Sequence, residues 1–198
     1  MGSCQGSDSV EKSTNSGMDI KIYYFDVYNR AEPHRMLLNH AGVSFEDVRI
    51  DMKDWMKLKP TMPDGVTPAI RFKHNGKEKL IGQSVSMLRF LGRVYGYYPA
   101  DPLQAYKVDC FVATYADVMG KFYSAAMEKD PDVKAQKIND LFETYLPKVM
   151  KAAEEQLKSN GGKKFMFGDR LNIADFWYGC IYTNYFNNPK VAYGTEIW

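Results

Sequence analysis

Hydrophobic and polar residues in the first half of the chain form short segments typical of strands and amphipathic helices. Residues 20–25 (IKIYYF) are rich in β-branched and aromatic side chains, which predicts a strand. Helical spacing follows over residues 31–41 until Gly42, and residues 43–50 alternate as a half-buried strand does. Residues 51–60 form a polar connection with room for one helical turn.

Two further strands are expected on either side of a tight turn. Residues 67–72 (TPAIRF) and 79–81 (KLI) flank the turn at residues 74–76 (HNG), which indicates a β-hairpin. Apolar residues then recur at helical spacing over residues 84–95. The resulting order, β-α-β-α-β-β-α, predicts a small α/β domain with a mixed sheet.

The second half of the chain has the pattern of long helices. Helices are predicted over residues 103–127, 133–157 and 173–186, and the second of these is expected to kink at Pro147. The segment 159–163 (SNGGK) reads as a turn between the last two helices. This half contains no segment that predicts a strand.

These elements divide the chain into two unlike domains. We expect an α/β domain over residues 18–97, a linker over residues 98–102 and an all-helical domain over residues 103–198. Residues 1–17 are dominated by polar residues and glycine, which indicates a disordered tail.

The start of the tail carries an imperfect acylation motif. Gly2 could accept myristate and Cys4 palmitate, but Gly6 stands where the motif needs Ser or Thr. Two acyl chains are needed for firm attachment, so membrane contact is expected only if Gly2 and Cys4 are both modified.

Composition and charge exclude several classes of function. The chain has 45% hydrophobic and 25% charged residues and a net charge of +2, so nucleic acid is not an expected partner. Cys4, Cys110 and Cys180 are far apart and form no CxxC pair, which argues against a disulfide framework or a metal site and suits the reducing cytoplasm. No apolar run reaches the length of a membrane span.

Four motifs, in this order and spacing, resemble the Sigma class of glutathione transferases. They are residues 22–35 (IYYFDVYNRAEPHR), 65–68 (GVTP), 83–84 (QS) and 168–175 (GDRLNIAD). The resemblance covers most of the chain. It implies a thioredoxin-like glutathione-binding domain followed by the helical domain of that family, with glutathione as co-substrate and no metal.

The resemblance places catalysis on Tyr24, at the end of the first predicted strand. A free thiol has a pKa near 8.5 and is a poor nucleophile until it ionises. A neutral phenol can donate a hydrogen bond to the sulfur and so favour the glutathione thiolate. Arg30 matches the arginine that supports this hydroxyl, whereas Tyr23 is expected on the opposite face of the strand. A structural role for Tyr24 as a buried strand residue is the alternative.

Glutathione itself is expected to bind along two backbone segments. Ser84 is predicted as a helix N-cap, where open N–H groups attract the γ-glutamyl carboxylate, and Gln83 forms a pair with it. Val66, Thr67 and Pro68 match the loop before a cis-proline, and the Thr67 backbone is expected to pair with the cysteinyl residue. Simple helix capping and a proline that begins a strand are the alternatives.

Side chains are expected to complete both ends of the site. Trp55 and Lys59 match the positions that hold the glycyl carboxylate of glutathione, although both could be ordinary loop residues. The acceptor is expected between the domains, near Tyr28, Tyr115 and Met119.

A capping motif is expected at the start of the last predicted helix. Asn172 is predicted as an N-cap with Asp175 reaching back to it, a structural motif.

Many relatives have an aspartate at the position of Ala113, where it reaches the glutathione amine across a dimer interface. In this chain Asp109 lies one turn earlier. We therefore expect either that glutathione binds more weakly or that another group binds its amine. The chain also ends at Trp198, earlier than relatives, which suggests a truncated product or a partner that covers this end.

Two functions follow from these features. The first is a cytoplasmic, dimeric detoxification enzyme that conjugates the glutathione thiolate to small electrophiles, with isomerisation of prostaglandin H2 to D2 as a narrower possibility. The second is a non-catalytic structural subunit or adaptor in a larger assembly, suggested by Ala113 and the short C-terminus. Thioredoxin-like redox activity is disfavoured because no cysteine lies at the start of the first helix.

Overall fold

The computed structural model describes residues 18–186 of the chain. The expected tail over residues 1–17, with its acylation sites Gly2 and Cys4, therefore lies outside the described residues, as does the C-terminal end from residue 187 onward.

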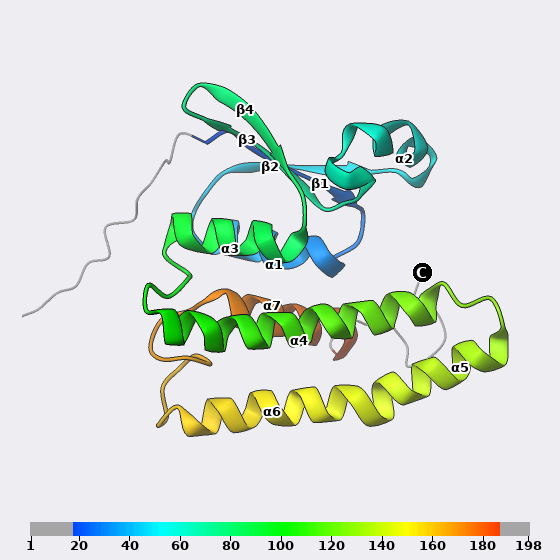
Figure 1. The fold of residues 1–198 in the computed structure, drawn as a ribbon, viewed down its shortest axis with the longest axis vertical. Helices are drawn as coiled ribbons and strands as arrows, with labels where there is room; N and C mark the ends of the chain where they lie inside the picture. The colour runs from blue at the N-terminus through cyan, green and yellow to red at the C-terminus, as the bar shows by residue number, and fades with distance from the viewer. Residues whose placement is uncertain (1–17, 187–198) are drawn as a thin grey trace, which may run out of the picture.

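A four-stranded mixed sheet forms the first part of the structure (Figure 1). Its strands are β1 (Ile20–Phe25), β2 (Phe45–Ile50), β3 (Ala69–His74) and β4 (Lys77–Ile81), in the order β2-β1-β3-β4. β1 runs parallel to β2 and antiparallel to β3. The hairpin between β3 and β4 turns at Asn75 and Gly76, whose φ angles of 51° and 73° suit a two-residue turn.

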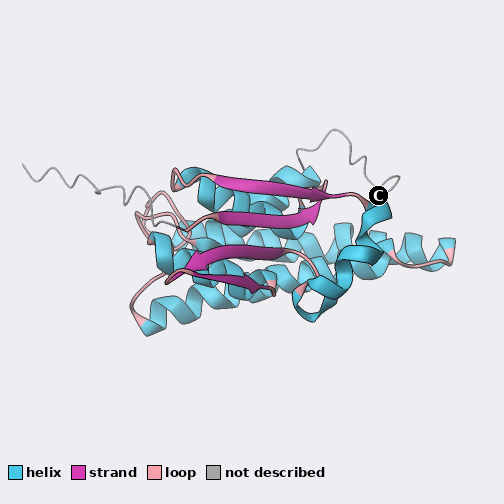
Figure 2. Cartoon of the chain, turned by 90° about the horizontal axis from the view of Figure 1, so that it is seen from above, coloured by secondary structure: helices cyan, strands magenta, loops and turns pink. Residues whose placement is uncertain are grey.

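Helices cover one face of this sheet. α1 (Glu32–His40) and α3 (Ser84–Tyr95) lie against that face, and Figure 2, which looks onto the sheet, shows the helices behind it. Burial alternates along β1: Ile20, Ile22 and Tyr24 are buried, whereas their neighbours are only half-buried. Tyr24 and Tyr23 therefore point to opposite faces, as the strand period requires.

Short helical segments connect these elements. The 3₁₀ turn η1 (Asn29–Ala31) leads from β1 into α1. Between β2 and β3 lie α2 (Met52–Leu58) and two further 3₁₀ turns, η2 (Lys59–Thr61) and η3 (Pro63–Gly65). α2 has seven residues, more than the single turn expected from the sequence, and the side chain of Asp51 caps its N-terminus.

The second part of the structure is helical. It consists of α4 (Pro102–Ala126), α5 (Pro131–Asn139), the π-helical segment η4 (Asp140–Tyr145), α6 (Leu146–Ser159), α7 (Ile173–Ile181) and the π-helical turn η5 (Tyr182–Phe186). α7 contacts both α1 and α4, so one hydrophobic core continues through both parts (Figure 1). Gly92 on α3 allows this approach, since a Cβ there would lie 2.6 Å from Ile173 Cγ2.

The long helices depart from regular geometry in two places. The second predicted helix is interrupted by η4, which directly precedes Pro147. Pro147 has no N–H and its ring clashes with the carbonyl four residues earlier, Glu143, so the distortion falls inside η4. The last predicted helix is regular only to Ile181 and ends in η5.

The predicted fold class is confirmed. The elements follow the order β-α-β-α-β-β-α and then continue as helices, as a thioredoxin-like domain followed by a helical domain does. α3 ends at Tyr95 and α4 begins at Pro102. We therefore propose that the linker between the two domains lies at residues 98–102, as expected from the sequence. Over residues 18–186, none of the helices is both long and apolar enough to cross a membrane.

A capping box fixes the start of α7. The Asn172 side chain accepts a hydrogen bond from the Ala174 N–H at 2.9 Å. Asp175 accepts from the Asn172 N–H at 2.9 Å and from the Asn172 side-chain amide at 2.7 Å. The other carboxylate oxygen of Asp175 accepts from the Met166 N–H at 2.9 Å, so this one side chain holds both the helix and the preceding loop.

We expect Asp175→Ala to destabilise the protein by roughly 2–3 kcal/mol, because three donors lose their acceptor in a partly buried place. Urea unfolding followed by circular dichroism measures the change. Asp130→Ala, at the exposed N-cap of α5, is the matched control and should cost about 1 kcal/mol. Equal losses in the two variants would contradict the linking role of Asp175.

His34 joins α1 to the start of α3. Its side chain is fully buried, and Nε2 lies 2.8 Å from the Ser84 carbonyl oxygen. A carbonyl only accepts, so Nε2 carries the hydrogen. Burial lowers the pKa of His34 to about 4, which keeps the ring neutral in the folded protein.

This lowered pKa predicts a pH-dependent stability. In the unfolded chain His34 has a pKa near 6.5, so as the pH falls below 6.5 the unfolded state gains a proton that the folded state does not. Stability therefore decreases as the pH is lowered, until the folded state is also protonated near pH 4. We expect wild type to lose roughly 2–3 kcal/mol more than His34→Gln between pH 7 and pH 4.5. Denaturant midpoints at the two pH values test this, with the exposed His74→Gln as control. An identical pH dependence in His34→Gln and wild type would rule the explanation out.

Candidate functional site

Tyr24 lies at the carboxyl end of β1, on the face covered by helices. Its side chain is 6% exposed, and the Arg35 guanidinium lies 6.0 Å from its ring centroid. Burial raises the pKa of Tyr24, and the charge and backbone N–H of Arg30 oppose that rise. The phenol therefore keeps its proton at neutral pH and remains a hydrogen-bond donor.

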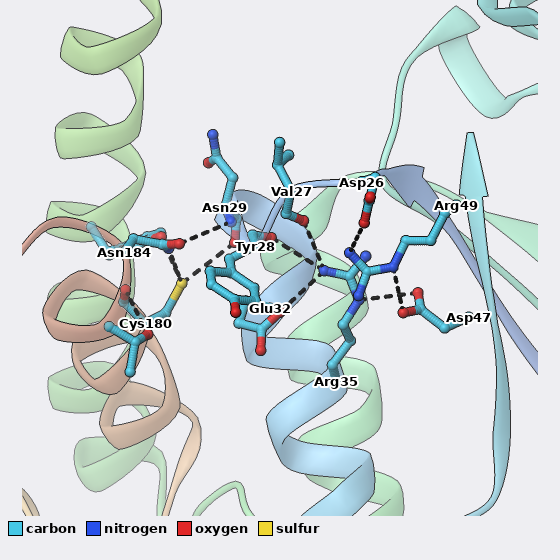
Figure 3. A network of polar contacts seen from close by, with 12 residues as sticks. Asp26, Val27, Tyr28, Asn29, Glu32, Arg35, Asp47, Arg49, Cys180 and Asn184 are labelled. Atoms are coloured by element: carbon cyan, nitrogen blue, oxygen red, sulfur yellow. Dashed lines mark hydrogen bonds and ion pairs between the residues drawn. The ribbon is translucent and has the colours of Figure 1, made fainter. Parts of the chain in front are cut away.

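Arg35 holds the loop that follows β1 (Figure 3). Its Nη1 donates to the carbonyls of Val27 and Tyr28, at 3.0 and 3.4 Å. Ion pairs with Glu32 at 3.1 Å and Asp47 at 3.0 Å fix the guanidinium itself. This buried network positions the backbone that leads to Arg30.

The cis-proline loop lies beside the end of β1. The Thr67–Pro68 peptide bond is cis. Tyr23 pairs with Ala69 in the antiparallel register, so the preceding residues Pro68 and Thr67 flank Tyr24 and the residue after it. The cis-proline loop therefore lies beside the end of the strand that carries Tyr24. Val66, one residue before Thr67, is exposed.

The start of α3 differs in detail from the sequence prediction. Ser84 is the first helical residue, and the N-cap is Gln83, with a φ of 67° and no side-chain capping bond. The prediction of Ser84 as the N-cap is therefore wrong by one residue, because Gln83, with its positive φ, is the last residue outside helical geometry. The first-turn N–H groups of α3 are left without a side-chain acceptor, which is the arrangement that binds a carboxylate.

Asp64 lies beside this helix start. Its carboxylate accepts a hydrogen bond from the Gln83 side-chain amide at 3.3 Å. The two segments touch because Gly82 packs on η3, where a Cβ at Gly82 would lie 3.0 Å from Pro63 Cβ. The sequence analysis missed Asp64, since nothing local distinguishes it from other turn aspartates.

Trp55 in α2 and Lys59 in η2 lie in the segment between β2 and the cis-proline. The Trp55 ring meets the Phe25 ring edge-on at 5.3 Å, directly after Tyr24 in the chain. The Lys59 side chain runs along Gly65, whose Cβ position lies 3.6 Å from Lys59 Cε. The structure therefore brings Lys59 to the loop that precedes the cis-proline and Trp55 to the end of β1.

The three predicted acceptor residues are not equally accessible. Tyr28 is 50% exposed, whereas Tyr115 and Met119 are buried. The Tyr115 ring stacks on Trp177 with centroids 4.0 Å apart, and its hydroxyl lies 3.4 Å from Cys180 Sγ. An acceptor pocket at these residues stays a prediction.

The substitute suggested for Ala113 is already engaged. Asp109 accepts hydrogen bonds from Arg89 Nε at 2.7 Å and from the Tyr98 hydroxyl at 2.9 Å. Ala113 itself is exposed on α4 and offers only a methyl group. Asp64 is therefore the better placed carboxylate for a cationic group at the start of α3.

Comparisons with known proteins agree with this geometry. Residues 116–192 match the family model of the glutathione S-transferase C-terminal domain. The chain is 38% identical over 175 residues to a glutathione S-transferase of Anopheles gambiae, covering 87% of this chain and 83% of that protein. It is 34% identical over 160 residues to the hematopoietic prostaglandin D synthase of Gallus gallus, covering 81% and 76%.

A solved structure of this family has a similar fold. The Fasciola hepatica sigma class glutathione transferase superposes with a TM-score of 0.71 at 28% identity, covering 84% of this chain and 80% of that one. The resemblance drawn from the four sequence motifs is confirmed, and the chain belongs to the glutathione S-transferase family.

Proposed function

We propose that this protein is a glutathione transferase in which the Tyr24 hydroxyl stabilises the glutathione thiolate. The observation that carries the proposal is the position of that hydroxyl. The Tyr24 side chain is buried at the end of β1 with a raised pKa, and β1 pairs with the strand that directly follows the cis Thr67–Pro68 bond. These features supply a donor for sulfur and backbone groups for the peptide around it.

The chemical step is nucleophilic attack by sulfur. The thiol proton leaves to solvent, and the hydrogen bond from Tyr24 favours the thiolate that remains. A sulfur lone pair then forms a C–S bond to the electrophilic carbon of the acceptor. The leaving group departs with its electron pair. With an activated alkene, the electron pair instead moves to the neighbouring carbon, which takes a proton from water.

The peptide is proposed to lie across the loop and the helix start. The γ-glutamyl carboxylate binds the first-turn N–H groups of α3 next to Gln83 and Ser84. The cysteinyl backbone pairs with Thr67 between Val66 and Pro68. The indole N–H of Trp55 and the ammonium of Lys59 bind the glycyl carboxylate.

Asp64 is proposed to receive the γ-glutamyl ammonium. That cation needs an acceptor beside the α3 N-terminus, and Asp64 is held there by Gln83. No ion pair joins Asp64 to a cation within residues 18–186, so its charge is available to a ligand.

Finer aspects of the function are also proposals. A relative is named a prostaglandin D synthase, and the same thiolate could open an endoperoxide. Isomerisation is therefore the second candidate activity. We propose a homodimer that acts in detoxification in the cytoplasm. Exposed apolar side chains on α4, Leu103 and Tyr106, support a protein interface. Tyr28 is proposed to contact the acceptor.

We expect Tyr24→Phe to raise the pKa of bound glutathione by about 1–2 units, because one charge-assisted hydrogen bond is lost. Conjugation of a chromogenic electrophile at neutral pH should then slow by roughly 10- to 100-fold. The pH dependence of kcat/KM and the ultraviolet absorbance of the thiolate measure the two effects.

Tyr23→Phe is the matched control, since Tyr23 lies on the other face of the same strand and should leave the rate nearly unchanged. Retention on immobilised glutathione without turnover in wild type would favour the adaptor. Neither retention nor turnover would reject glutathione as the ligand.

Asp64→Asn should raise the KM for glutathione by roughly three- to tenfold and leave kcat nearly unchanged, because the lost charge contacts the peptide away from the sulfur. Steady-state kinetics over a range of glutathione concentrations measures this. Glu78→Gln, which removes an exposed carboxylate on β4, is the control. An unchanged KM in Asp64→Asn would assign the ammonium to another group.

A further inference from the structure

A buried polar cluster connects the helical domain to the loop that carries Arg30 (Figure 3). It contains the Asn29 backbone, Tyr115 on α4, Cys180 on α7 and Asn184 on η5. Cys180 is fully buried and Asn184 is 6% exposed. Cys180 and Asn184 are four residues apart, so both side chains face the same loop.

The direction of each hydrogen bond in the cluster follows from its donors and acceptors. Cys180 Sγ lies 2.8 Å from Asn184 Nδ2, and an amide N–H can only donate. Sγ also lies 3.4 Å from the Asn29 carbonyl oxygen, which can only accept. The Cys180 thiol therefore donates to Asn29 while its sulfur accepts from Asn184.

This arrangement needs a protonated thiol, and burial provides it. Burial raises the pKa of Cys180 to about 12, so the S–H group persists at neutral pH. The Tyr115 hydroxyl, 3.4 Å from the sulfur, can supply a second donor. A thiol whose sulfur accepts hydrogen bonds is polarised, which strengthens the bond that its S–H donates to Asn29.

Asn184 also fixes the other side of Asn29. The Asn29 N–H donates to Asn184 Oδ1 at 3.3 Å. Asn29 has a φ of 36°, in the left-handed region that few residues adopt. Cys180 and Asn184 thus hold the peptide groups on both sides of a residue with an uncommon backbone conformation.

The peptide group after Asn29 reaches the predicted catalytic tyrosine. The Asn29 carbonyl and the Arg30 N–H belong to the same planar unit. The Arg30 backbone acts on the Tyr24 hydroxyl and lowers the pKa of that phenol, against the larger effect of burial. A hydrogen bond accepted at the carbonyl of a peptide group polarises the whole group and makes its N–H a stronger donor.

We propose that Cys180 and Asn184 are positioning residues that act on Tyr24 through the Asn29–Arg30 peptide group. By orienting and polarising that group, they strengthen the hydrogen bond that Tyr24 offers to the glutathione sulfur. The proposal rests on the proposed function, because it concerns the same thiolate.

The charged and titratable groups around this chain of hydrogen bonds do not interfere with its test. Arg30 and Arg35 act on the pKa of Tyr24, and Glu32, Arg35 and Tyr115 act on that of Cys180. None of these side-chain types has an ordinary pKa between 6 and 8. His34, which acts on the Arg30 backbone, has its pKa lowered to about 4 by burial and so does not titrate between pH 6 and 8. The glutathione thiol is therefore the group whose ionisation a rate profile over this range reports.

Cys180→Ala removes the S–H donor and tests the proposal. We expect the apparent pKa of bound glutathione, from the kcat/KM profile and from thiolate absorbance, to rise by a few tenths of a unit, with a two- to threefold loss of rate at neutral pH. Cys180→Ser keeps a donor and should recover most of the loss. Cys110→Ala, at an exposed cysteine, should leave the profile unchanged.

A double substitution separates action through Tyr24 from a general loss of structure. In the Tyr24→Phe background, Cys180→Ala should produce no further rise in the pKa of bound glutathione. The proposal is overturned if Cys180→Ala raises the pKa of bound glutathione equally in the wild-type and Tyr24→Phe backgrounds. It is also overturned if Cys180→Ala lowers the unfolding midpoint but raises that pKa in neither background.

Two remaining outcomes are also informative. If Cys180→Ala does not fold, Asn184→Leu is measured in the same way, and an unchanged pKa in that variant overturns the proposal. A wild-type protein that does not lower the pKa of glutathione at all overturns the proposed function instead, independently of Cys180.

Discussion

The Tyr24 hydroxyl can stabilise a thiolate only while it keeps its own proton, and the surrounding structure meets that constraint. Burial beneath α1 and α3 raises the pKa of the phenol, so it stays neutral. The nearby charges of Arg30 and Arg35 act in the opposite direction and prevent the hydroxyl from becoming a poor donor. The site therefore depends on a balance between burial and positive charge at the end of one strand.

That balance is set by a short loop that is held from two sides. Arg35 binds the carbonyls of Val27 and Tyr28 from the α/β part, and Cys180 and Asn184 bind the Asn29 backbone from the helical part (Figure 3). The continuous core between α1, α4 and α7 fixes these two sets of side chains relative to each other. The helical part is thus tied directly to the chemistry proposed for the sheet.

Local patterns were sufficient to predict the elements but not the contacts between distant residues. The β1 alternation, the Asn75-Gly76 turn and the α3 spacing are each encoded within a few neighbouring residues, so the order of elements followed from the sequence. The π-helical segment η4 did not, because its position depends on how the helix accommodates Pro147 within a packed bundle.

The same limit applies to the site. Tyr24, Thr67 and Ser84 were identified through a family resemblance, whereas periodicity alone cannot distinguish a catalytic tyrosine from a structural one. Cys180 and Asn184 lie more than 150 residues from Asn29 in sequence, and no local motif relates them. Tyr115 was expected at an acceptor surface because of its helical position, but packing on Trp177 buries it.

A crystal structure of the protein with bound glutathione tests the central claim most directly. The account predicts the sulfur within hydrogen-bond distance of the Tyr24 hydroxyl oxygen, with the peptide's cysteinyl backbone alongside Thr67. Glutathione bound with its sulfur away from Tyr24, or a Tyr24 hydroxyl sealed off from the peptide by other side chains, would contradict it.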